Sequence, residues 1–247
     1  MSGGRSNVSP SSVEIRIRTY PEGFRQSEHS HEMPVMNVVL SGLIEETTPD
    51  SHFITDTWGI YIRPAGLVHA NEYRNGPTRV LTIRLTGAPR DGQLRRATGD
   101  RLDVRTLRRI ISLLQKGRAE QGIPTTVKEI ERATRPDRGE IDPLTPELTR
   151  LVASEGVIRE AAREVRMHPG SFSRRFRREL GIPPSVWRRL NRVRTAAGLL
   201  AGDIPLASVA IDAGFSDQSH MCRDFRNLLG ITPREYRRLI DTSSDSA

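Results

Sequence analysis

Arginine and glutamine side chains recur on two segments of the chain that resemble each other. Residues 171–187 align with residues 220–236, pairing Arg174 with Arg223, and both segments contain the pattern Gly-Ile-x-Pro. Such an internal repeat indicates one supersecondary unit that is used twice. Arginine and glutamine are the side chains that bond bidentately to guanine and adenine edges in the major groove of DNA. We therefore predict two helices that contact DNA.

The first repeated segment predicts a helix over residues 169–180. Phe172, Phe176 and Leu180 are spaced four positions apart and form its inward face. Its outward face carries the candidate DNA contacts, which are Gly170, Ser173, Arg174, Arg177 and Arg178. Residues near the start of the helix are better placed for bases, and the later arginines lie nearer the phosphates.

The second repeated segment predicts a helix of the same kind over residues 217–229. Met221, Phe225 and Leu229 form its inward face. Its outward candidate DNA contacts are Gln218, Ser219, Arg223 and Arg226, with Cys222 between them. A short helix and a tight turn precede each of the two helices. Each copy therefore fits a helix-turn-helix, whose second helix enters the major groove.

An alternative is an ordinary helical bundle in which both arginine faces are simply solvated. Against it, most of the formal net charge of +8 falls within residues 145–240, which indicates a polyanionic partner. A longer helix predicted over residues 185–200 would span about 24 Å. It could hold two DNA-contacting helices about one turn of DNA apart, roughly 34 Å. The duplication and the charge together favour DNA binding.

The overall composition is that of a globular protein, with 36% hydrophobic and 28% charged residues. No apolar run is long enough to span a membrane. Residues 1–12 lack the apolar core of a secretory signal. The single cysteine, Cys222, excludes an intramolecular disulfide and a thiolate zinc site. We expect a cytoplasmic protein.

Two different periodicities divide the chain. Between residues 13 and 86, short alternating segments broken by glycine and proline predict an all-β sandwich or barrel. Residues 101–115 predict an amphipathic helix that either caps this barrel or pairs with a second subunit. We predict a two-domain α+β fold. Its parts are a disordered tail over 1–12, a β domain with its helix over 13–116, a linker over 117–143, a helical domain over 144–240 and a second tail over 241–247.

The helical part resembles the C-terminal DNA-binding domain of the AraC/XylS family of bacterial transcription regulators. The similarity extends over residues 148–239 and is strongest in the second half. The matching positions there are Val209, Ala210, Gly214, Phe215, Ser216, Asp217, Gln218, Ser219, Phe225, Gly230, Thr232, Pro233, Tyr236 and Arg237. The resemblance implies binding to double-stranded promoter DNA, contact with RNA polymerase, and activation more than repression. It also implies a homodimer that uses the helix over residues 101–115.

The resemblance assigns base contacts residue by residue. They fall on Gly170, Ser173 and Arg174 in the first helix, and on Gln218, Ser219, His220 and Arg223 in the second. Three residues depart from the family pattern. Arg166 stands where the first turn usually has glycine, and His168 replaces the usual serine cap, which weakens that helix start modestly. Gly170 offers no side chain where a base contact is possible. We therefore expect the first helix chiefly to hold the DNA backbone and the second chiefly to read bases.

The N-terminal part resembles a cupin barrel in the placement of its histidines. The first cupin motif matches at Gly23, His29, His31 and Gly42, and the second at Pro64, Gly66 and His69. In metal cupins these histidines join a glutamate around a divalent metal. Here Met36 stands at the place of the glutamate, and Tyr73 replaces the final asparagine. Three neutral imidazoles can still hold zinc or a similar ion, with a fourth position open.

Three roles stay open for His29, His31 and His69. They are metal ligands, polar lining of a pocket for a small organic effector, or structural residues, and we favour pocket lining without a metal. Trp58, Tyr61 and Tyr73 are either pocket walls or core residues. We predict a regulator that is no enzyme, whose barrel senses a small molecule and repositions the DNA-binding domain. The alternative is a metal-binding or enzymatic cupin barrel fused to a DNA-binding domain.

Overall fold

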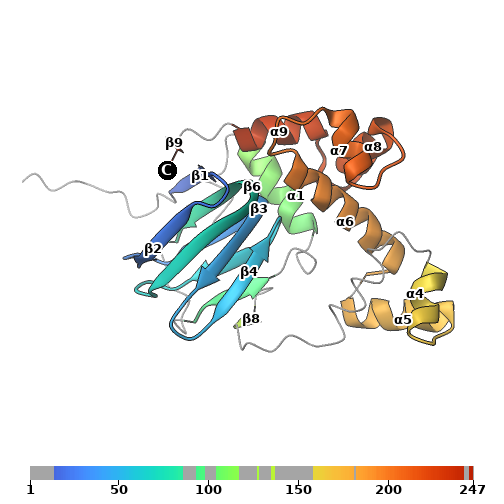
Figure 1. Ribbon diagram of the computed structural model, residues 1–247, viewed down its shortest axis with the longest axis horizontal. Coiled ribbons are helices and arrows are strands. Elements are labelled where there is room, and N and C mark those ends of the chain that lie inside the picture. The colour runs from blue at the N-terminus through green and yellow to red at the C-terminus, as the bar shows by residue number, and fades with distance from the viewer. Residues whose placement is uncertain are drawn as a thin grey trace, which may run out of the picture.

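The computed structural model describes residues 14–85, 93–97, 104–116, 127, 135–136, 158–180, 182–241 and 245–246 (Figure 1). Predictions on the tail 1–12, on most of the linker 117–143 and on residues 144–157 lie outside this part of the chain. The N-terminal part is a β-sheet with one covering helix and the C-terminal part is helical, which confirms the predicted two-domain α+β class. Within the described residues, no helix is long and apolar enough to cross a bilayer. The domain boundaries stay predictions.

Two long antiparallel strands organise the sheet, β3 (Val35–Thr47) and β6 (His69–Arg84). The sheet order is β8-β7-β5-β3-β6-β1-β9, with β2 paired to β6 and β4 paired to β3. The other strands are β1 (Ile15–Tyr20), β2 (Arg25–His29), β4 (His52–Asp56), β5 (Ile60–Arg63), β7 (Arg95–Ala97), β8 (Arg135–Pro136) and β9 (Asp245–Ser246). The pairing brings β2, β3, β5 and β6 together, and these strands carry the buried polar residues Glu46, Arg63 and His69.

Side chains of β3 alternate between two cores. Leu40 packs toward the helices, whereas Val39 packs inside the barrel with Tyr61. This is the period-two alternation of a strand. The pairing with β6 shifts register on either side of Ser41, next to Gly42, whose φ is +82°. A Cβ added at Gly42 would lie 2.4 Å from the Oγ1 of Thr78, so this bend of the strand requires glycine.

α1 (Val104–Gln115) covers the outer side of the sheet with its apolar stripe. Leu107, Ile110 and Ile111 lie in that stripe and are exposed by 1% or less. Of the two roles predicted for this helix, capping the barrel is confirmed. Leu107, Ile110 and Ile111 are not available to a second subunit, because they are already buried within one chain. The use of this helix in a homodimer stays a prediction.

The C-terminal part consists of two helix-turn-helix units joined by α6 (Pro184–Leu199). The first unit is α4 (Ile158–Glu164) with α5 (Pro169–Leu180), and the second unit is α7 (Leu206–Asp212) with α8 (Gln218–Leu229). The last helix is α9 (Pro233–Asp241). The helices predicted over residues 169–180, 185–200 and 217–229 are confirmed, and their ends shift by at most one residue.

The two units are packed differently. Phe172 and Phe176 of the first unit share a separate core with Trp187 of α6, and no sheet residue is among the described members of that core. Phe225 and Leu229 of the second unit belong to the large core that also contains α1 and the outer side of the sheet. The second unit is therefore packed against the barrel, whereas the first unit stands apart from it beyond the end of α6 (Figure 1).

Candidate DNA interface and barrel site

The turn between α7 and α8 is fixed by a residue of α6. Gly214 takes a φ of +78° in this turn, which suits glycine. Arg192 donates from Nη1 to the Gly214 carbonyl oxygen at 3.2 Å, and its guanidinium carbon lies 5.6 Å from the ring centroid of Phe215. A charge-assisted hydrogen bond and a cation–π contact thus come from one side chain. They hold the turn of the second unit against α6.

Asp217 caps the start of α8. Its Oδ1 accepts the backbone N–H of His220 at 2.7 Å, and its Oδ2 accepts the hydroxyl of Ser216 at 2.9 Å. These hydrogen bonds, that of His220 first, hold the pKa of the Asp217 carboxyl below its usual value. A carboxylate at this place also interacts favourably with the helix dipole. The cap therefore fixes the first turn of α8, which carries Gln218 and Ser219.

α8 presents the outward face that the sequence predicts. Gln218, Ser219, Arg223 and Arg226 are exposed, and we call these four residues the reading face. The inward residues, including Phe225, are buried. Exposed glutamine and arginine on the second helix of a helix-turn-helix have the chemistry and the placement for base recognition. The individual base contacts stay predictions.

His220 is oriented differently from the reading face. Its half-buried ring meets that of Phe215 edge-on, with 5.2 Å between centroids, and its Nδ1 lies 3.2 Å from the Oγ of Ser216. Its Nε2 lies 3.7 Å from Oδ2 of Asp224. These contacts direct the imidazole toward the protein, so they support a role in orienting α8. Its contact with a base remains a prediction from the family resemblance.

Asp224 is a buried acidic residue that sequence reasoning missed. It is 5% exposed, and its Oδ1 pairs at 3.0 Å with Arg189 of α6. A buried carboxylate needs a partner, so this pair fixes α8 against the connecting helix. A signal was present in the sequence. Asp224 follows His220 by four positions, which places the two side chains on the same side of α8.

In the first unit, two residues that depart from the family pattern still form the turn and the helix start. Arg166 adopts a φ of +53° in the turn, which is uncommon for a residue other than glycine. The Nδ1 of His168 accepts the backbone N–H of Gly170 at 3.2 Å. This is the hydrogen bond that a serine cap would make. His168 therefore still caps α5, and the predicted weakening of the helix start is at least partly offset.

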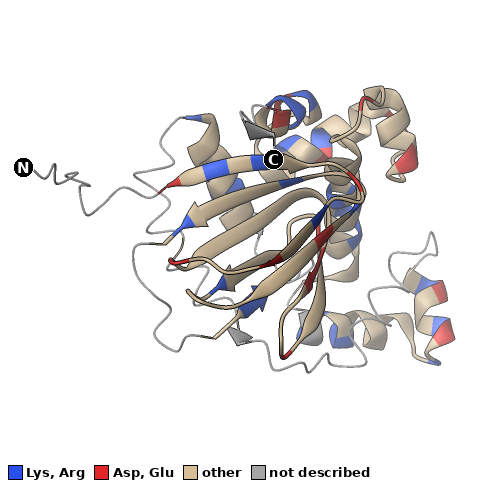
Figure 2. Ribbon diagram, turned by 60° about the vertical axis from the view of Figure 1, so that its left-hand side comes forward, with Lys and Arg blue, Asp and Glu red and all other residues tan. Residues whose placement is uncertain are grey.

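α5 presents arginines outward. Arg174, Arg177 and Arg178 are exposed, Ser173 is half-buried, and Gly170 has no side chain. This face has fewer groups for base edges than the reading face of α8. Figure 2 shows basic residues on the sheet as well as on the helices. Positive charge alone therefore does not locate a candidate DNA interface. The position of exposed arginines on α5 and α8, the second helices of the two helix-turn-helix units, is the better indication.

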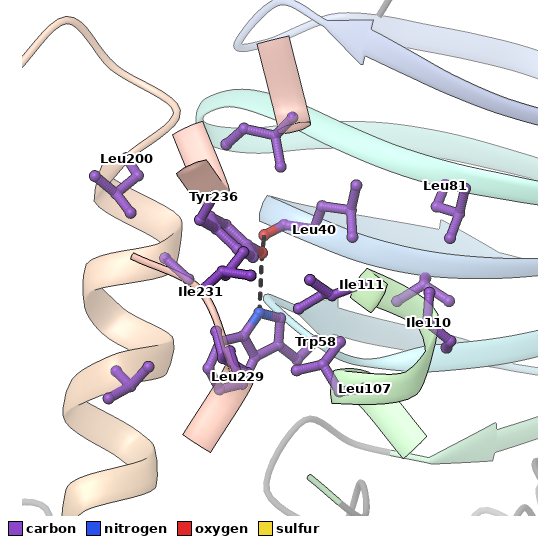
Figure 3. Packing of buried hydrophobic residues seen from close by; sticks show 14 of the residues in the cluster. Leu40, Trp58, Leu81, Leu107, Ile110, Ile111, Leu200, Leu229, Ile231 and Tyr236 are labelled. Carbon is purple, nitrogen blue, oxygen red and sulfur yellow. Dashed lines mark hydrogen bonds between the residues drawn. The ribbon is translucent and has the colours of Figure 1, made fainter. Parts of the chain in front are cut away.

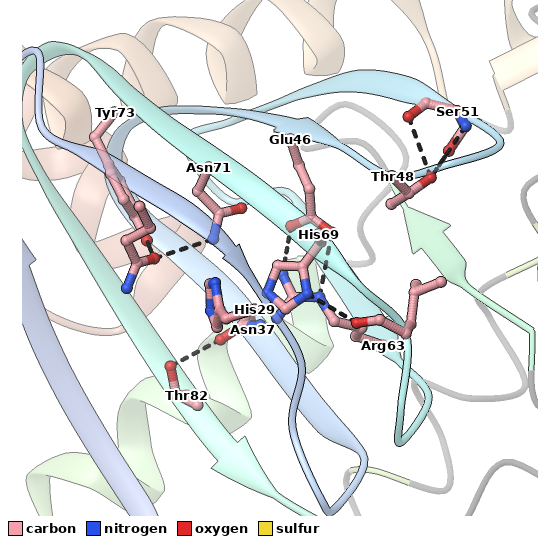
Figure 4. Close-up of polar contacts among 12 residues, drawn as sticks. His29, Asn37, Glu46, Thr48, Ser51, Arg63, His69, Asn71, Tyr73 and Thr82 are labelled. Atoms are coloured by element: carbon pink, nitrogen blue, oxygen red, sulfur yellow. Dashed lines mark hydrogen bonds and ion pairs between the residues drawn. The ribbon is translucent and has the colours of Figure 1, made fainter.

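Three histidines meet in the barrel. His29 of β2 stands opposite His69 of β6, and one potential ligand atom from each of these two and from His31 lies within 4.8 Å of the others. His29 Nδ1 is 2.9 Å from the carbonyl oxygen of Ser27, and His69 Nδ1 is 3.0 Å from that of Leu67. His29 and His69 lie close together in Figure 4. Because a carbonyl accepts only, each of these Nδ1 atoms carries the proton and each Nε2 keeps a lone pair.

The cluster fits a divalent transition metal. Histidine ligands are commonly oriented by a backbone carbonyl on the other ring nitrogen. His69 Nε2 is buried and has no hydrogen-bond partner among the described residues. Burial, followed by the charge of Arg63, lowers the pKa of His69 to about 3 and that of His31 to about 4. Both imidazoles are therefore neutral at physiological pH, as metal ligation requires.

Beside the histidines lies a buried ion pair that the sequence did not reveal. Arg63 of β5 and Glu46 of β3 are 2% and 0% exposed. Arg63 Nε donates to Glu46 Oε1 at 3.2 Å, and Arg63 Nη2 pairs with Glu46 Oε2 (Figure 4). The guanidinium carbon also lies 5.2 Å from the ring centroid of Tyr61. The bidentate pair leaves the barrel interior without net charge at this point.

The aromatic residues predicted as pocket walls fall in two places. Tyr61 and Tyr73 lie inside the barrel, where Tyr73 Oη donates to Gln26 Oε1 at 2.7 Å and the ring stacks on Tyr20 at 3.9 Å. Trp58 instead lies in the core that the outer side of the sheet shares with the helices. Trp58 as a wall of the histidine pocket is wrong, because the turn before β5 directs its side chain outward.

Residues 56–58, the last residue of β4 and the turn that follows it, connect the barrel to the helices, and we call this segment the docking turn. Asp56 forms an ion pair at 3.0 Å with Arg194 of α6. The next residue, Thr57, lies against the same helix, because a Cβ added at Gly198 would be 3.2 Å from its Oγ1. The third residue, Trp58, contacts α9. The docking turn therefore contacts α6 and α9 at once.

Trp58 makes a buried hydrogen bond across the two domains. Its Nε1 donates to Tyr236 Oη of α9 at 3.0 Å, and Tyr236 Oη donates to the Leu40 carbonyl oxygen of β3 at 2.6 Å. Figure 3 shows this pair between Leu229 and Ile111, where α8, α1 and the sheet meet. The barrel and the second unit are thus joined by a polar contact within a shared apolar core.

Comparison with known proteins places the C-terminal part in a described class. Residues 161–239 match a family model described as a helix-turn-helix domain. The regulatory protein PocR of Salmonella typhimurium is 34% identical over 88 residues, 35% of this chain and 29% of PocR. The arabinose operon regulatory protein of Escherichia coli (strain K12) is 36% identical over 88 residues, 35% of this chain and 30% of that protein. The chain thus matches about three tenths of the length of these relatives, and the resemblance of its C-terminal part is confirmed.

Solved structures also show similarity. The chain is similar to ToxT from Vibrio cholerae O395, with 11% identity and a TM-score of 0.42, over 94% of this chain and 99% of that one. It is similar to the C-terminal domain of AraT, a response regulator from Geobacillus stearothermophilus, with 25% identity and a TM-score of 0.36. That match covers 39% of this chain and 88% of the AraT domain.

Proposed function

We propose that this chain is a sequence-specific transcription regulator, on the premise that its C-terminal part is a helix-turn-helix domain of the AraC/XylS type. The observation that carries the proposal is the reading face of α8. It stands exposed on a helix that Asp217 caps and that Arg189 of α6 pairs with through Asp224, and Arg192 of α6 holds the turn before it. A second arginine-rich helix, α5, belongs to the unit at the other end of α6. Two such helices on one connecting helix suit two adjacent half-sites of duplex DNA.

The two helix-turn-helix units would have different roles on DNA. Gln218, Ser219 and Arg223 offer donors and acceptors to base edges from the first half of α8. Arg177 and Arg178, on the second half of α5, suit phosphate oxygens and would supply affinity that depends on salt. The second unit would therefore contribute most of the sequence specificity.

The barrel would supply the regulatory input by binding a small-molecule effector near the histidines. If a divalent metal is bound there, His29, His31 and His69 would hold it, and the ion would offer an open coordination position to the effector. Binding that favours one arrangement of barrel and helices would shift the population of that arrangement. RNA polymerase, promoter activation and a homodimer belong to this proposal as well. A dimer would need a surface other than the buried stripe of α1.

A second candidate function is an enzymatic barrel fused to the DNA-binding domain. The Nδ1 atoms of His29 and His69 are bonded to backbone carbonyls, which leaves each Nε2 free to bind a metal. This favours the enzyme, because catalytic metal sites keep three protein ligands and an open position. Elemental analysis of the purified protein, with His29→Ala and His69→Ala as controls, separates the two. Stoichiometric iron or manganese that both variants lose would favour the enzyme. A protein without metal that binds an organic ligand would favour the sensor.

DNA binding itself can be tested without knowing the effector. The full chain is used to select duplexes from a random DNA pool, with an Arg174→Ala/Arg223→Ala double variant as the control. We expect an enriched motif with two parts whose centres lie about one helical turn apart. A pool that the wild type and the control enrich equally would contradict the proposed function.

A further inference from the structure

We infer that Trp58, a residue of the barrel, is a positioning residue for the second helix-turn-helix unit. Trp58 contacts Tyr236 of α9, and Tyr236 in turn contacts α8, so Trp58 itself need not touch DNA. The inference rests on the proposed function, and it names which of the two DNA-contacting units the barrel holds in place.

The backbone of Trp58 is strained in a way that directs its side chain. The residue is 1% exposed and has a φ of +70°, which bulky side chains rarely adopt. Its backbone N–H donates to the Val39 carbonyl oxygen at 2.6 Å, and the following N–H of Gly59 donates to that of Asp56 at 2.8 Å. Strain of this kind persists only where the surroundings enforce it, and it clusters at functional contacts. Here it turns the indole out of the sheet and toward α9.

The hydroxyl of Tyr236 is satisfied entirely by the barrel. It accepts the indole N–H of Trp58 and donates to the carbonyl oxygen of Leu40, and the tyrosine is 0% exposed. Removing the indole N–H would leave the Tyr236 hydroxyl with one of its two hydrogen bonds, and removing the hydroxyl would leave the buried Trp58 Nε1 without its acceptor. The contact between Trp58 and Tyr236 therefore fixes the orientation of the tyrosine, which an apolar contact alone would not do.

Behind Tyr236 stands α8. The Tyr236 ring meets Phe225 edge-on with 6.0 Å between centroids, and Phe225 lies on the inward face of α8. A second connection reaches the same region, because Arg79 of β6 donates to the Ala201 carbonyl oxygen at 2.8 Å and pairs with Asp241 of α9 at 2.6 Å. The barrel thus supports the side of α8 that lies opposite the reading face.

The first unit offers a matched contrast. Trp187 is 3% exposed and packs on Phe176, with 6.1 Å between ring centroids, in a core whose described members include no barrel residue. The chain has two tryptophans, Trp58 and Trp187. Trp58 therefore packs behind the second unit, and Trp187 packs behind the first. The same substitution at the two positions tests the inference and its control.

Amide hydrogen exchange of the full chain gives a readout without DNA. Trp58→Phe keeps an aromatic ring and removes the N–H, and Tyr236→Phe removes the hydroxyl. Each should accelerate exchange in α8 and α9 about threefold to tenfold and leave α4 and α5 unchanged. Trp187→Phe should instead accelerate amide exchange in α4 and α5. Equal acceleration in both units, or none in α8 and α9, would overturn the inference.

The selected duplex provides the functional readout. Trp58→Phe should weaken binding to a duplex with both half-sites about threefold to tenfold, and leave binding to the half-site of the first unit unchanged. Adding Tyr236→Phe should cost less than Tyr236→Phe does alone, because the hydrogen bond between the two side chains is then already lost and only the one to the Leu40 carbonyl oxygen remains to be removed. Equal losses on both duplexes, or a gain in affinity, would contradict the inference. If no duplex is selected at all, the proposed function fails, and the exchange experiment still decides whether Trp58 holds α8.

Discussion

Arg223 is exposed on α8 and is the strongest candidate for reading a base. Arg223→Ala should weaken binding to the selected duplex by about 1–3 kcal/mol, because a bidentate contact to guanine is lost. The loss should be confined to duplexes that carry the preferred base at one position. Anisotropy titrations against a set of single-base substitutions measure it. Equal losses on the selected and random duplexes would assign Arg223 to phosphate contact.

Arg177 on α5 is the matched arginine for phosphate contact. Arg177→Ala should lower the affinity for all duplexes alike, because a phosphate carries no sequence information. It should also reduce the slope of log affinity against log salt by about 1. The same titrations, repeated over a range of salt concentrations, give this slope. A slope identical to that of the wild type would rule out the phosphate role.

The sequence predicted the orientation of some of these side chains better than that of others. Arg174 and Arg223 follow from helical periodicity, since the buried phenylalanines fix which face is outward. His220 could not be oriented in this way, because its ring is directed by Ser216, which precedes the helix, and by Asp224, which lies one turn later in α8. Local spacing predicts a face, whereas hydrogen bonds decide where one side chain points.

The start of α5 depends on an unusual cap. His168→Ala should lower the free energy of unfolding by about 0.5–2 kcal/mol, because the N–H of Gly170 loses its acceptor. His168→Ser should restore it, since serine makes the same hydrogen bond. Denaturant unfolding followed by circular dichroism measures both variants. An alanine variant as stable as the wild type would show that the histidine contributes nothing as a cap.

The cap of α8 predicts a dependence on pH. The pKa of Asp217 in the folded protein lies below its usual value of 3.8. Its stabilisation is therefore complete above that value and is lost as the pH falls through the lower folded pKa. The difference in unfolding free energy between the wild type and Asp217→Ala should be constant from about pH 5 to 8 and shrink below about pH 4. A difference that stays undiminished at the lowest accessible pH would contradict the cap.

The helices could be predicted because their signals are local. Proline stands at the first position of α5, α6 and α9, and Gly230 ends α8 with a φ of +79°. The role of α1 could not be decided in advance. A barrel and a second subunit would bury the same apolar stripe, so periodicity alone does not distinguish them.

The arrangement of the whole chain depends on contacts that no local pattern records. Trp58 and Tyr236 are 178 positions apart, and each reads in isolation as an ordinary core aromatic. Glu46 and Arg63 pair although the register of β3 and β5 places Arg63 opposite Val35, so their contact comes from the folding of the whole sheet and not from neighbouring positions on paired strands. Sequence reasoning therefore predicted both domains, the α5 and α8 faces and the three histidines, but not the docking turn or the ion pair.

The most direct test of DNA recognition is the equilibrium affinity of the full chain for the selected duplex and for a scrambled duplex of equal length. Both are measured at one fixed salt concentration, because salt changes the two affinities together. We predict that the selected duplex binds on the order of 10³-fold more tightly, or better, as specific regulators do. Equal affinities for the two duplexes would contradict the claim that α5 and α8 recognise a DNA sequence.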